Sequence, residues 1–157
     1  MGYERIDRPQ GKLYHYTKRG NLEQILKDGR IRKFQDRESW FCASIGDTLR
    51  LMKMTVMQEG NLYYDVHGFP RRYPPFEAGD YVIMELSPRF QNGEWVIWNQ
   101  EFAEGTPEEM LAIGEEFSHL KLGFRGDLKF YPAPRIYEVA ELLEEQKQDT
   151  GMTMQPQ

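Results

Sequence analysis

Few side chains in this sequence have a type and setting suited to chemistry, and His15 is the first of them. It stands in the segment LYHYT at positions 13–17, between two tyrosines. A neutral imidazole has one donor and one acceptor nitrogen, so it can hold a ribose hydroxyl without a metal ion. The alternative is a core histidine hydrogen-bonded to the backbone, and the segment alone leaves both interpretations open.

Two carboxylates are candidates for a different task. Glu101 ends the segment NQE at 99–101, after an aromatic run, and Asp127 ends the segment GFRGD at 123–127. A carboxylate that faces a developing positive charge stabilises it electrostatically. Most Asp and Glu side chains are solvated at the surface, and that is the alternative for both residues.

The basic residues offer anion binding, and the sequence predicts no metal site. Arg30 follows a predicted helix and can bind a diphosphate, although surface solubility is the slightly favoured role. His119, near Lys121 and Arg125, can bind phosphate or close a helix end. The three histidines are too far apart in sequence for metal-ligand spacing. Cys42 is the sole cysteine, and its apolar neighbours favour a buried thiol over a nucleophile.

Apolar patterning predicts the elements that must position these residues in the first half of the chain. We expect a strand at 13–17, a helix from the cap Asn21 to Gly29, a short strand at Ile31, a buried strand at 40–43 and a helix from the cap Asp47 to Val56.

The pattern in the second half of the chain predicts mostly strands. Residues 60–79 predict loops or short hairpin pieces, and residues 81–86 predict a strand. The Asn92-Gly93 turn predicts a hairpin with the strand at 95–98. Thr106 and Glu109 form a capping box for a helix that ends near Phe117, and late strands are expected at 128–131 and 136–140. This segregation of helices and strands favours an α+β fold.

Length and charge limit the class of protein. The chain has 157 residues, enough for one domain. Residues 1–11 and 146–157 lack apolar periodicity, so we expect flexible ends around a single domain at 12–145. The net charge of −5 argues against a general nucleic-acid-binding surface. The sequence has neither a membrane-length apolar stretch nor a signal-peptide core, so we expect no membrane partner and a cytoplasmic location.

Two blocks of the sequence, taken together, resemble the ADP-ribosyltransferase superfamily, especially its bacterial nucleic-acid-directed members. In the first, LYHYTKRGNLEQILKDG at 13–29, a His-x-Thr strand precedes an Asn-Leu pair and a short helix that ends in Gly. In the second, SWFCAS at 39–44, an aromatic strand ends in small residues and precedes a helix. The resemblance implies two small, mostly antiparallel sheets around a nucleotide cleft.

The resemblance also implies a ligand and residue roles. NAD would be the substrate, with its ribose held by His15, its nicotinamide amide held by Tyr16 and Thr17, and further cofactor contacts from Phe41 and Ser44. The family uses a late carboxylate, for which Glu101 and Asp127 are the two candidates here. The helix after the second block lacks the Tyr that many members stack on nicotinamide, so that role would pass to Phe41, Trp40 or a loop aromatic.

The implied activity is transfer of ADP-ribose from NAD to a protein or nucleic-acid acceptor. A related alternative is an enzyme like the RNA 2′-phosphotransferases, which use the same NAD cleft and rely on a set of Arg and His residues. The other alternative is a nucleotide-binding or partner-binding module that keeps the fold without the catalytic carboxylate, since fold alone does not carry activity.

Overall fold

The computed structural model describes residues 2–33, 37–65, 67–99 and 104–154. Its helices are α1 (Leu22–Asp28), α2 (Ile45–Met54), α3 (Glu108–Leu120) and α4 (Val139–Met154), with 3-10 turns η1 (Arg19–Asn21) and η2 (Ala78–Asp80). Its strands are β1 (Gly2–Ile6), β2 (Leu13–Lys18), β3 (Arg30–Ile31), β4 (Ser39–Phe41), β5 (Leu62–Tyr64), β6 (Pro70–Arg72), β7 (Tyr81–Leu86), β8 (Trp95–Asn99), β9 (Leu122–Phe124), β10 (Leu128–Lys129) and β11 (Arg135–Glu138). Within these ranges, no helix combines the length and apolar character that crossing a membrane requires.

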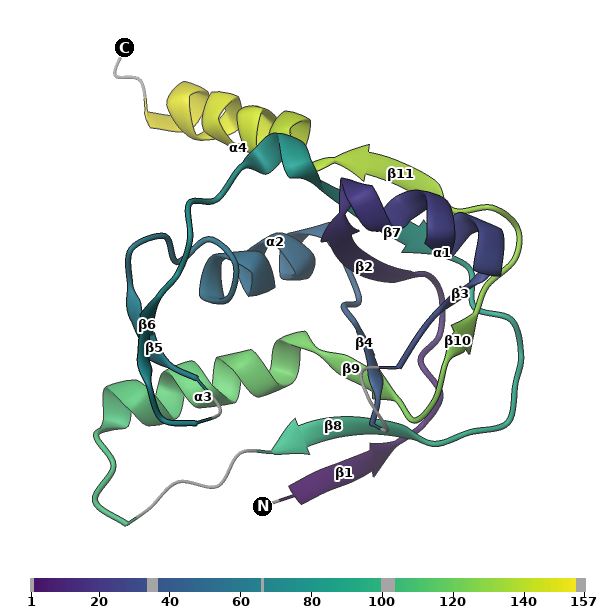
Figure 1. Ribbon diagram of the computed structural model, residues 1–157, viewed down its shortest axis with the longest axis horizontal. Coiled ribbons are helices and arrows are strands. Elements are labelled where there is room, and N and C mark those ends of the chain that lie inside the picture. Colours follow the sequence, from purple (N-terminus) through teal and green to yellow (C-terminus); the bar gives the residue numbers. More distant parts are fainter. Residues whose placement is uncertain (1, 34–36, 66, 100–103, 155–157) are drawn as a thin grey trace.

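Two small antiparallel sheets form the body of the molecule. The first has the strand order β11-β7-β2, and the second has the order β1-β8-β9-β4. They join at an isolated bridge in which Tyr14 and Cys42 exchange two backbone hydrogen bonds, of 2.9 and 2.8 Å. Figure 1 shows the first sheet above the second, with α2 and α3 side by side to the left of this junction. The α+β class expected from the sequence is therefore confirmed.

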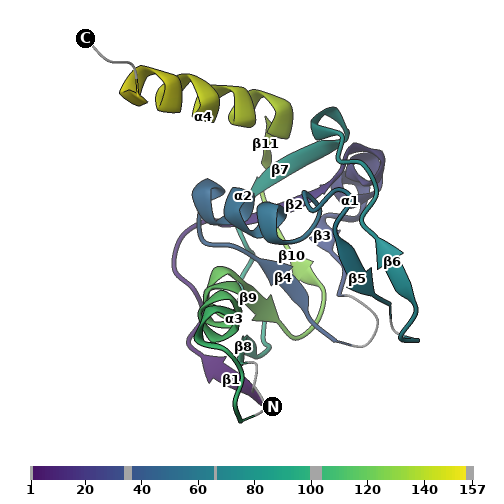
Figure 2. The same cartoon turned by 90° about the vertical axis from the view of Figure 1, so that its left-hand side faces the viewer.

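The core fills the space between these sheets. Residues from both sheets and from β3 and β10 form its main buried cluster: Leu13, Ile31, Phe41, Met84, Leu86, Trp95, Phe124, Leu128 and Phe130. A second cluster, Leu49, Met52, Ile83 and Val139, packs α2 and α4 against β7. Figure 2 shows α4 over the first sheet and α3 beside β8 and β9 of the second. Helices thus cover each sheet while the junction between the sheets stays accessible from one side.

The expected hairpin around Asn92-Gly93 is wrong. Strand β7 is the central strand of its sheet, with β2 on one edge and β11 on the other, so neither edge is available to β8. Strand β8 instead pairs with β1 and β9. Gly93 serves a packing purpose, because a Cβ there would come within 2.5 Å of the Phe124 ring. The segment at Asn92-Gly93 is irregular and forms no assigned turn, so this signal predicted neither a turn nor the partner of the following strand.

Two helix caps also differ from expectation. The N-cap of α2 is Ser44, whose Oγ accepts a hydrogen bond from the backbone N–H of Asp47 at 3.0 Å. Asp47 lies in the first turn, where its charge suits the helix dipole. The N-cap position of α3 is Pro107, without a side-chain cap. Gly29 ends α1 in the left-handed conformation with φ of 67°, as the sequence predicts.

Both ends of the chain contain more structure than the sequence indicated. Strand β1 lies within the first 11 residues and pairs along its whole length with β8. Helix α4 continues past residue 145 to Met154. Neither segment has strong apolar periodicity, and β1 depends on cross-strand pairing, which a single-sequence pattern does not reveal.

Candidate functional site

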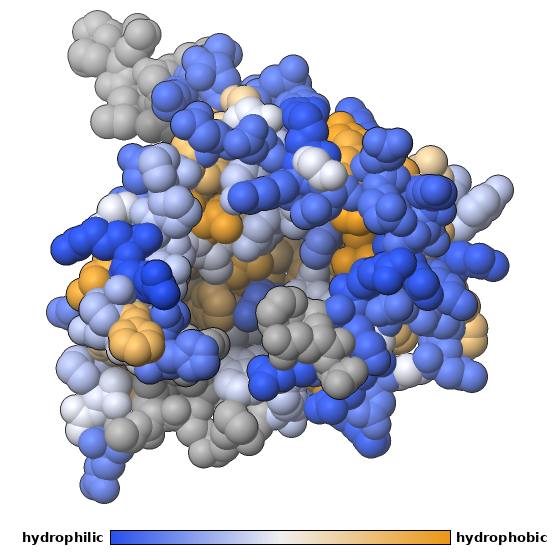
Figure 3. Space-filling model, in the orientation of Figure 1, coloured by the Kyte–Doolittle hydropathy of each residue, from blue (hydrophilic) through white to orange (hydrophobic). Residues whose placement is uncertain are grey.

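A pocket of about 310 Å³ opens at the junction of the two sheets, and we call it the His15 pocket. Its lining is mostly aromatic, with a few polar groups: Tyr14, His15, Tyr16, Trp40, Phe41, Cys42, Thr48, Leu51, Thr55, Phe117 and Lys121. Figure 3 shows a hollow with an apolar floor at the middle of this face of the molecule. An apolar pocket with a few convergent polar groups is the usual form of a small-molecule site.

The pocket exists because two strands separate. Tyr14 pairs with Cys42, and one ladder step further Tyr16 would lie opposite Trp40. No pairing forms there within the described residues, and the Trp40 carbonyl accepts from the His15 ring instead. Strand β2 is an edge strand, and alternate residues direct their backbone groups to alternate edges. The N–H and C=O of Tyr16 therefore face the pocket side.

His15 is fixed in one orientation and held neutral. Its Nδ1 lies 2.9 Å from the Trp40 carbonyl, which can only accept, so Nδ1 carries the proton. Burial lowers the pKa of His15 below its ordinary value, against the smaller opposing effect of this hydrogen bond. Its Nε2 then keeps a lone pair, and the ring makes no other hydrogen bond with the described residues. This nitrogen can accept a hydrogen bond from a hydroxyl in the pocket.

The aromatic residues of the pocket have two distinct tasks. Phe41 is 1% exposed and lies with its ring centroid 5.7 Å from that of His15, so it supports the imidazole from the core. Trp40, Tyr16 and Phe117 are half-buried and present open surface to the pocket. A stacked ligand ring would therefore contact one of these three, and Phe41 would act through His15.

Lys121 brings a positive charge to the pocket without an acidic partner in the described residues. Its Nζ lies 4.7 Å from the centroid of the Trp40 ring and 4.1 Å from that of Phe117. Contacts of this kind attract a cation to the faces of aromatic rings. Burial nevertheless lowers the pKa of Lys121, because desolvation penalises the charged form. An anionic group of a ligand would restore the charge that these surroundings disfavour.

Cys42 is not a nucleophile in this setting. Its side chain is 2% exposed, and burial raises the pKa of Cys42 to about 11. The thiolate is the reactive form, so at neutral pH this thiol is inert. Its place at the bridge to Tyr14 gives it a structural role.

Two further residues of the expected NAD site act as local supports. Thr17 is buried and accepts a hydrogen bond from the Asn21 side chain at 3.3 Å. Ser44 caps α2, so its hydroxyl is already engaged with the backbone of Asp47. Neither residue lines the His15 pocket, whereas His15, Tyr16 and Phe41 do. The structure thus brings three of the expected contacts together.

Asp127 and Arg30, expected as a carboxylate and a diphosphate contact, meet each other away from this pocket. Asp127 Oδ1 accepts from the Lys33 backbone N–H at 2.7 Å, and Oδ2 lies 3.5 Å from Arg30 Nη1. These contacts hold β3 beside the turn that precedes β10. Glu101 lies outside the described residues. No described residue lining the His15 pocket is a carboxylate.

A second pocket, of about 260 Å³, adjoins the first, and we call it the Glu38 pocket. Tyr3, Arg37, Glu38, Trp40, Trp98, Phe117 and Lys121 line it, so the two pockets share Trp40, Phe117 and Lys121. Glu38 is 3% exposed, and its Oε1 has no hydrogen-bond partner in the part of the chain that the structure describes. The sequence analysis missed Glu38. Glu38 is in phase with Trp40 and Cys42 on one face of an apolar strand. This pattern could have indicated a functional site, because acidic residues are rarely buried on such a face.

The described part of the chain contains no cluster of His, Cys, Asp and Glu that could hold a metal ion. No protein-family model, curated protein or solved structure matches the chain. Any function must therefore be argued from the sequence motifs and from these two pockets.

Proposed function

We propose that the protein binds NAD with its nicotinamide riboside portion in the His15 pocket and transfers ADP-ribose to an acceptor. One observation carries the proposal: His15, whose Nδ1 is held by the Trp40 carbonyl, and Tyr16, on the edge strand β2, line the same aromatic pocket. The resemblance of the two sequence blocks to ADP-ribosyltransferases leads to the same residues independently of the pocket.

The chemistry of the ligand suits the polar groups present. A ribose hydroxyl donates to Nε2 of His15, which is an acceptor because its partner nitrogen holds the proton. The nicotinamide carboxamide presents an N–H donor beside its carbonyl acceptor, and an exposed strand edge offers the complementary pair at Tyr16. Lys121, which also lines the pocket, suits the diphosphate. Trp40 and Phe117 supply stacking area where Lys121 does not cover their rings.

The transfer step needs a group that stabilises the ribose as it becomes cationic. The bond between the ribose carbon and the nicotinamide nitrogen breaks, nicotinamide leaves with the electron pair, and the acceptor attacks the same carbon. We propose Glu101 for the stabilising carboxylate. It follows Trp98 of the adjoining pocket by three residues, whereas Asp127 is occupied by Lys33 and Arg30. A carboxylate near the reacting carbon lowers the barrier electrostatically.

A second candidate function is nucleotide binding without transfer. The observation that favours it is that the described lining of the His15 pocket holds no carboxylate. Such a module would bind NAD through the same His15 and Tyr16 groups and release no nicotinamide.

The deciding experiment measures NAD binding and turnover separately. NAD should raise the melting temperature of the wild type, since a ligand that binds the folded state stabilises it. His15→Ala should lose most of this shift, and the exposed control His67→Ala should keep it. An unchanged shift in His15→Ala would remove the His15 pocket from the proposal.

Turnover then separates the enzyme from the binding module. Glu101→Gln should lower nicotinamide release by about a hundredfold or more with little change in NAD affinity, because the carboxylate acts on the transition state. Asp127→Asn is the matched control and should leave turnover nearly unchanged. Nicotinamide release that is absent from the wild type with every acceptor tried would favour the binding module. An effect of Asp127→Asn alone would make Asp127 the carboxylate.

A further inference from the structure

We propose that the Glu38 pocket is a binding site for a guanine base. The proposal goes beyond NAD binding and does not depend on it. It rests on a buried acceptor without a partner, on aromatic walls and on two cations, all in a cavity of about 260 Å³. A purine base is smaller than this cavity and leaves room for part of an attached sugar.

Glu38 is the recognition group. It is 97% removed from solvent, and the Tyr3 hydroxyl lies near its carboxylate. Burial and this contact with Glu38 raise the pKa of Tyr3, which keeps the phenol protonated as a donor. Among the described residues Oε1 nevertheless has no hydrogen-bond partner, although leaving a buried charged acceptor unsatisfied is costly. Oε1 itself is closed to solvent, so a ligand donor satisfies it once the Glu38 side chain turns toward the pocket that it lines.

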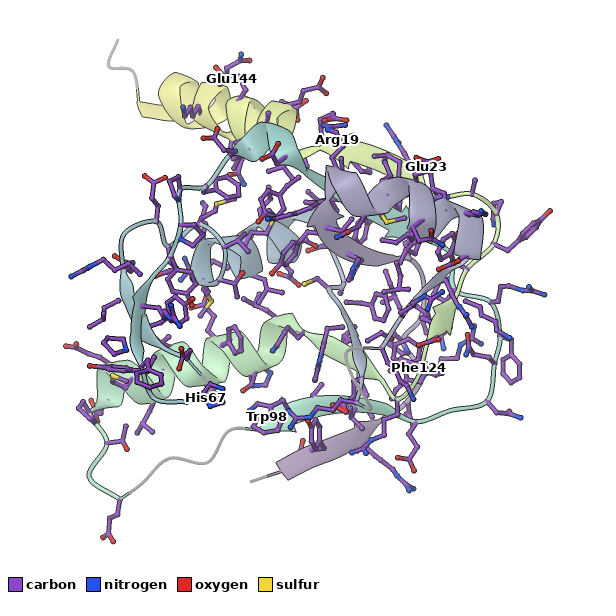
Figure 4. All side chains as sticks on the ribbon, in the orientation of Figure 1. Arg19, Glu23, His67, Trp98, Phe124 and Glu144 are labelled. Carbon is purple, nitrogen blue, oxygen red and sulfur yellow. The ribbon has the colours of Figure 1, made fainter. Side chains whose placement is uncertain are left out.

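The walls favour a flat ligand. Tyr3 and Trp98 form an edge-to-face pair, with ring centroids 4.8 Å apart and planes at 78°. Trp40 and Phe117 line the side shared with the His15 pocket. Figure 4 places Trp98 on β8, beside β1 and below α3, at this side of the second sheet. Stacking on such rings stabilises a bound base by an amount comparable to a good hydrogen bond.

The hydrogen-bonding requirement of the Glu38 carboxylate selects among flat ligands. A carboxylate only accepts hydrogen bonds, so its ideal partner presents two neighbouring N–H groups in one plane. Among the nucleobases, guanine does so with N1–H and its 2-amino group. Adenine and cytosine place a lone pair beside the amino group, and uracil flanks its N–H with two carbonyls. Each of these arrangements sets at least one oxygen or nitrogen lone pair against Glu38.

The guanidinium of an arginine side chain would also match a carboxylate geometrically. Arg37 and Lys121 line the same pocket, however, and neither forms an ion pair within the described residues. With one acidic and two basic side chains, the pocket repels a further cation and attracts the phosphate of a nucleotide. The charge balance therefore favours guanine over an arginine side chain.

The first test compares ligands on the wild-type protein by calorimetry, without NAD. GMP should bind at least tenfold more tightly than AMP. IMP, which keeps N1–H and lacks the 2-amino group, should bind more weakly than GMP. Equal affinities for GMP and AMP would overturn the proposal, and so would competition by acetyl-arginine amide at the concentration at which GMP binds. Because the ligands vary and the protein does not, this comparison holds even if a variant fails to fold.

The second test changes the acceptor. Glu38→Gln has nearly the same shape and should weaken GMP binding about tenfold or more, the loss expected for a charge-assisted hydrogen bond. Glu4→Gln, an exposed change on β1, is the matched control and should leave GMP binding unchanged. A folded Glu38→Gln protein that binds GMP like the wild type would refute the site.

The third test determines whether the bound guanine belongs to a free nucleotide or to a nucleic-acid strand. The trinucleotides TGT and TAT present guanine or adenine within a single strand. Tighter binding of TGT than of GMP would indicate a nucleic-acid strand, and binding of GMP alone would indicate a free nucleotide. Guanine-independent binding of both trinucleotides, together with no binding of GMP, would overturn the proposal.

Discussion

The His15 pocket and the Glu38 pocket share a wall of Trp40, Phe117 and Lys121. They differ in whether the central polar side chain has a hydrogen-bond partner. His15 is tied by one nitrogen to a backbone carbonyl and held neutral, so its burial costs little. Glu38 is more deeply buried than His15, and its Oε1 has no hydrogen-bond partner among the described residues. The first pocket is prepared at little cost to stability, and the second retains an unsatisfied group that a ligand would complete.

The difference shows how one strand can serve two purposes. Along β4 and the residues that flank it, Glu38, Trp40 and Cys42 alternate with Ser39 and Phe41. Phe41 faces the core and supports His15, while Glu38 and Trp40 face the second pocket. Substitutions in one pocket, in the other, or in the shared wall test this difference between the two sites.

The largest effect is expected from Phe41→Ala, which removes the core support of the His15 pocket. Truncation of a fully buried Phe should lower the free energy of unfolding by about 3–5 kcal/mol, as measured by urea unfolding. NAD binding should be lost, while GMP binding persists at temperatures where the variant is folded. Phe90→Ala is the control, since Phe90 is 76% exposed and should change stability little. Intact NAD binding in Phe41→Ala would contradict a supporting role for this ring.

The second prediction concerns pH and His15. Because the pKa of His15 is lowered in the folded state, the unfolded chain takes up a proton near the ordinary value of 6.5 and the folded chain does not. The contribution of neutral His15 is therefore present above pH 6.5 and lost as the pH falls below it, by up to about 1.4 kcal/mol per pH unit.

The measurement is the free energy of unfolding between pH 5 and 8 for wild type and His15→Asn. Asn keeps a donor for the Trp40 carbonyl but does not titrate. The wild type should lose more stability than His15→Asn as the medium is acidified. Parallel curves for the two proteins would show that His15 is not held neutral by the fold.

The third prediction applies to the opposite pocket. Glu38→Gln replaces a buried acceptor that carries charge with a neutral amide of the same shape. Without ligand, the free energy of unfolding should rise by about 1 kcal/mol, because an unsatisfied buried charge costs more than an unsatisfied amide. Denaturant unfolding checks this, with Glu4→Gln as the surface control. A clear loss of stability would mean that Glu38 has a structural partner and that the two pockets are alike.

The smallest effect is expected at the shared wall. Lys121→Met keeps the aliphatic stem beside Trp40 and Phe117 and removes the charge. NAD and GMP should each bind less tightly by a factor of about three to ten, since one charge-assisted contact to phosphate is lost. Lys27→Met, on the exposed face of α1, is the control. Weaker binding of only one ligand would show that the two sites do not share Lys121.

Local pattern was sufficient for much of the fold. The aromatic strand at 13–17, the helix that ends at Gly29 and the apolar strand at 81–86 each carry a strong short-range signal, and each forms as expected. The juxtaposition of His15 and Phe41, implied by the family resemblance, is also observed. The placement of Ser44 and Asp127 was not available from their types, because each uses its polar atoms on a neighbouring backbone N–H.

The sequence by itself thus determined the α+β class, most of the elements and the strand that carries His15. Only the tertiary structure decided which strands pair, that Tyr16 lacks a partner where Trp40 turns to His15, and that Glu38 is buried beside Lys121. The physical reason is the distance along the chain over which each kind of interaction acts. Periodicity and caps act over a few residues, whereas pairing, burial and the surroundings of a charge depend on residues far apart in the chain.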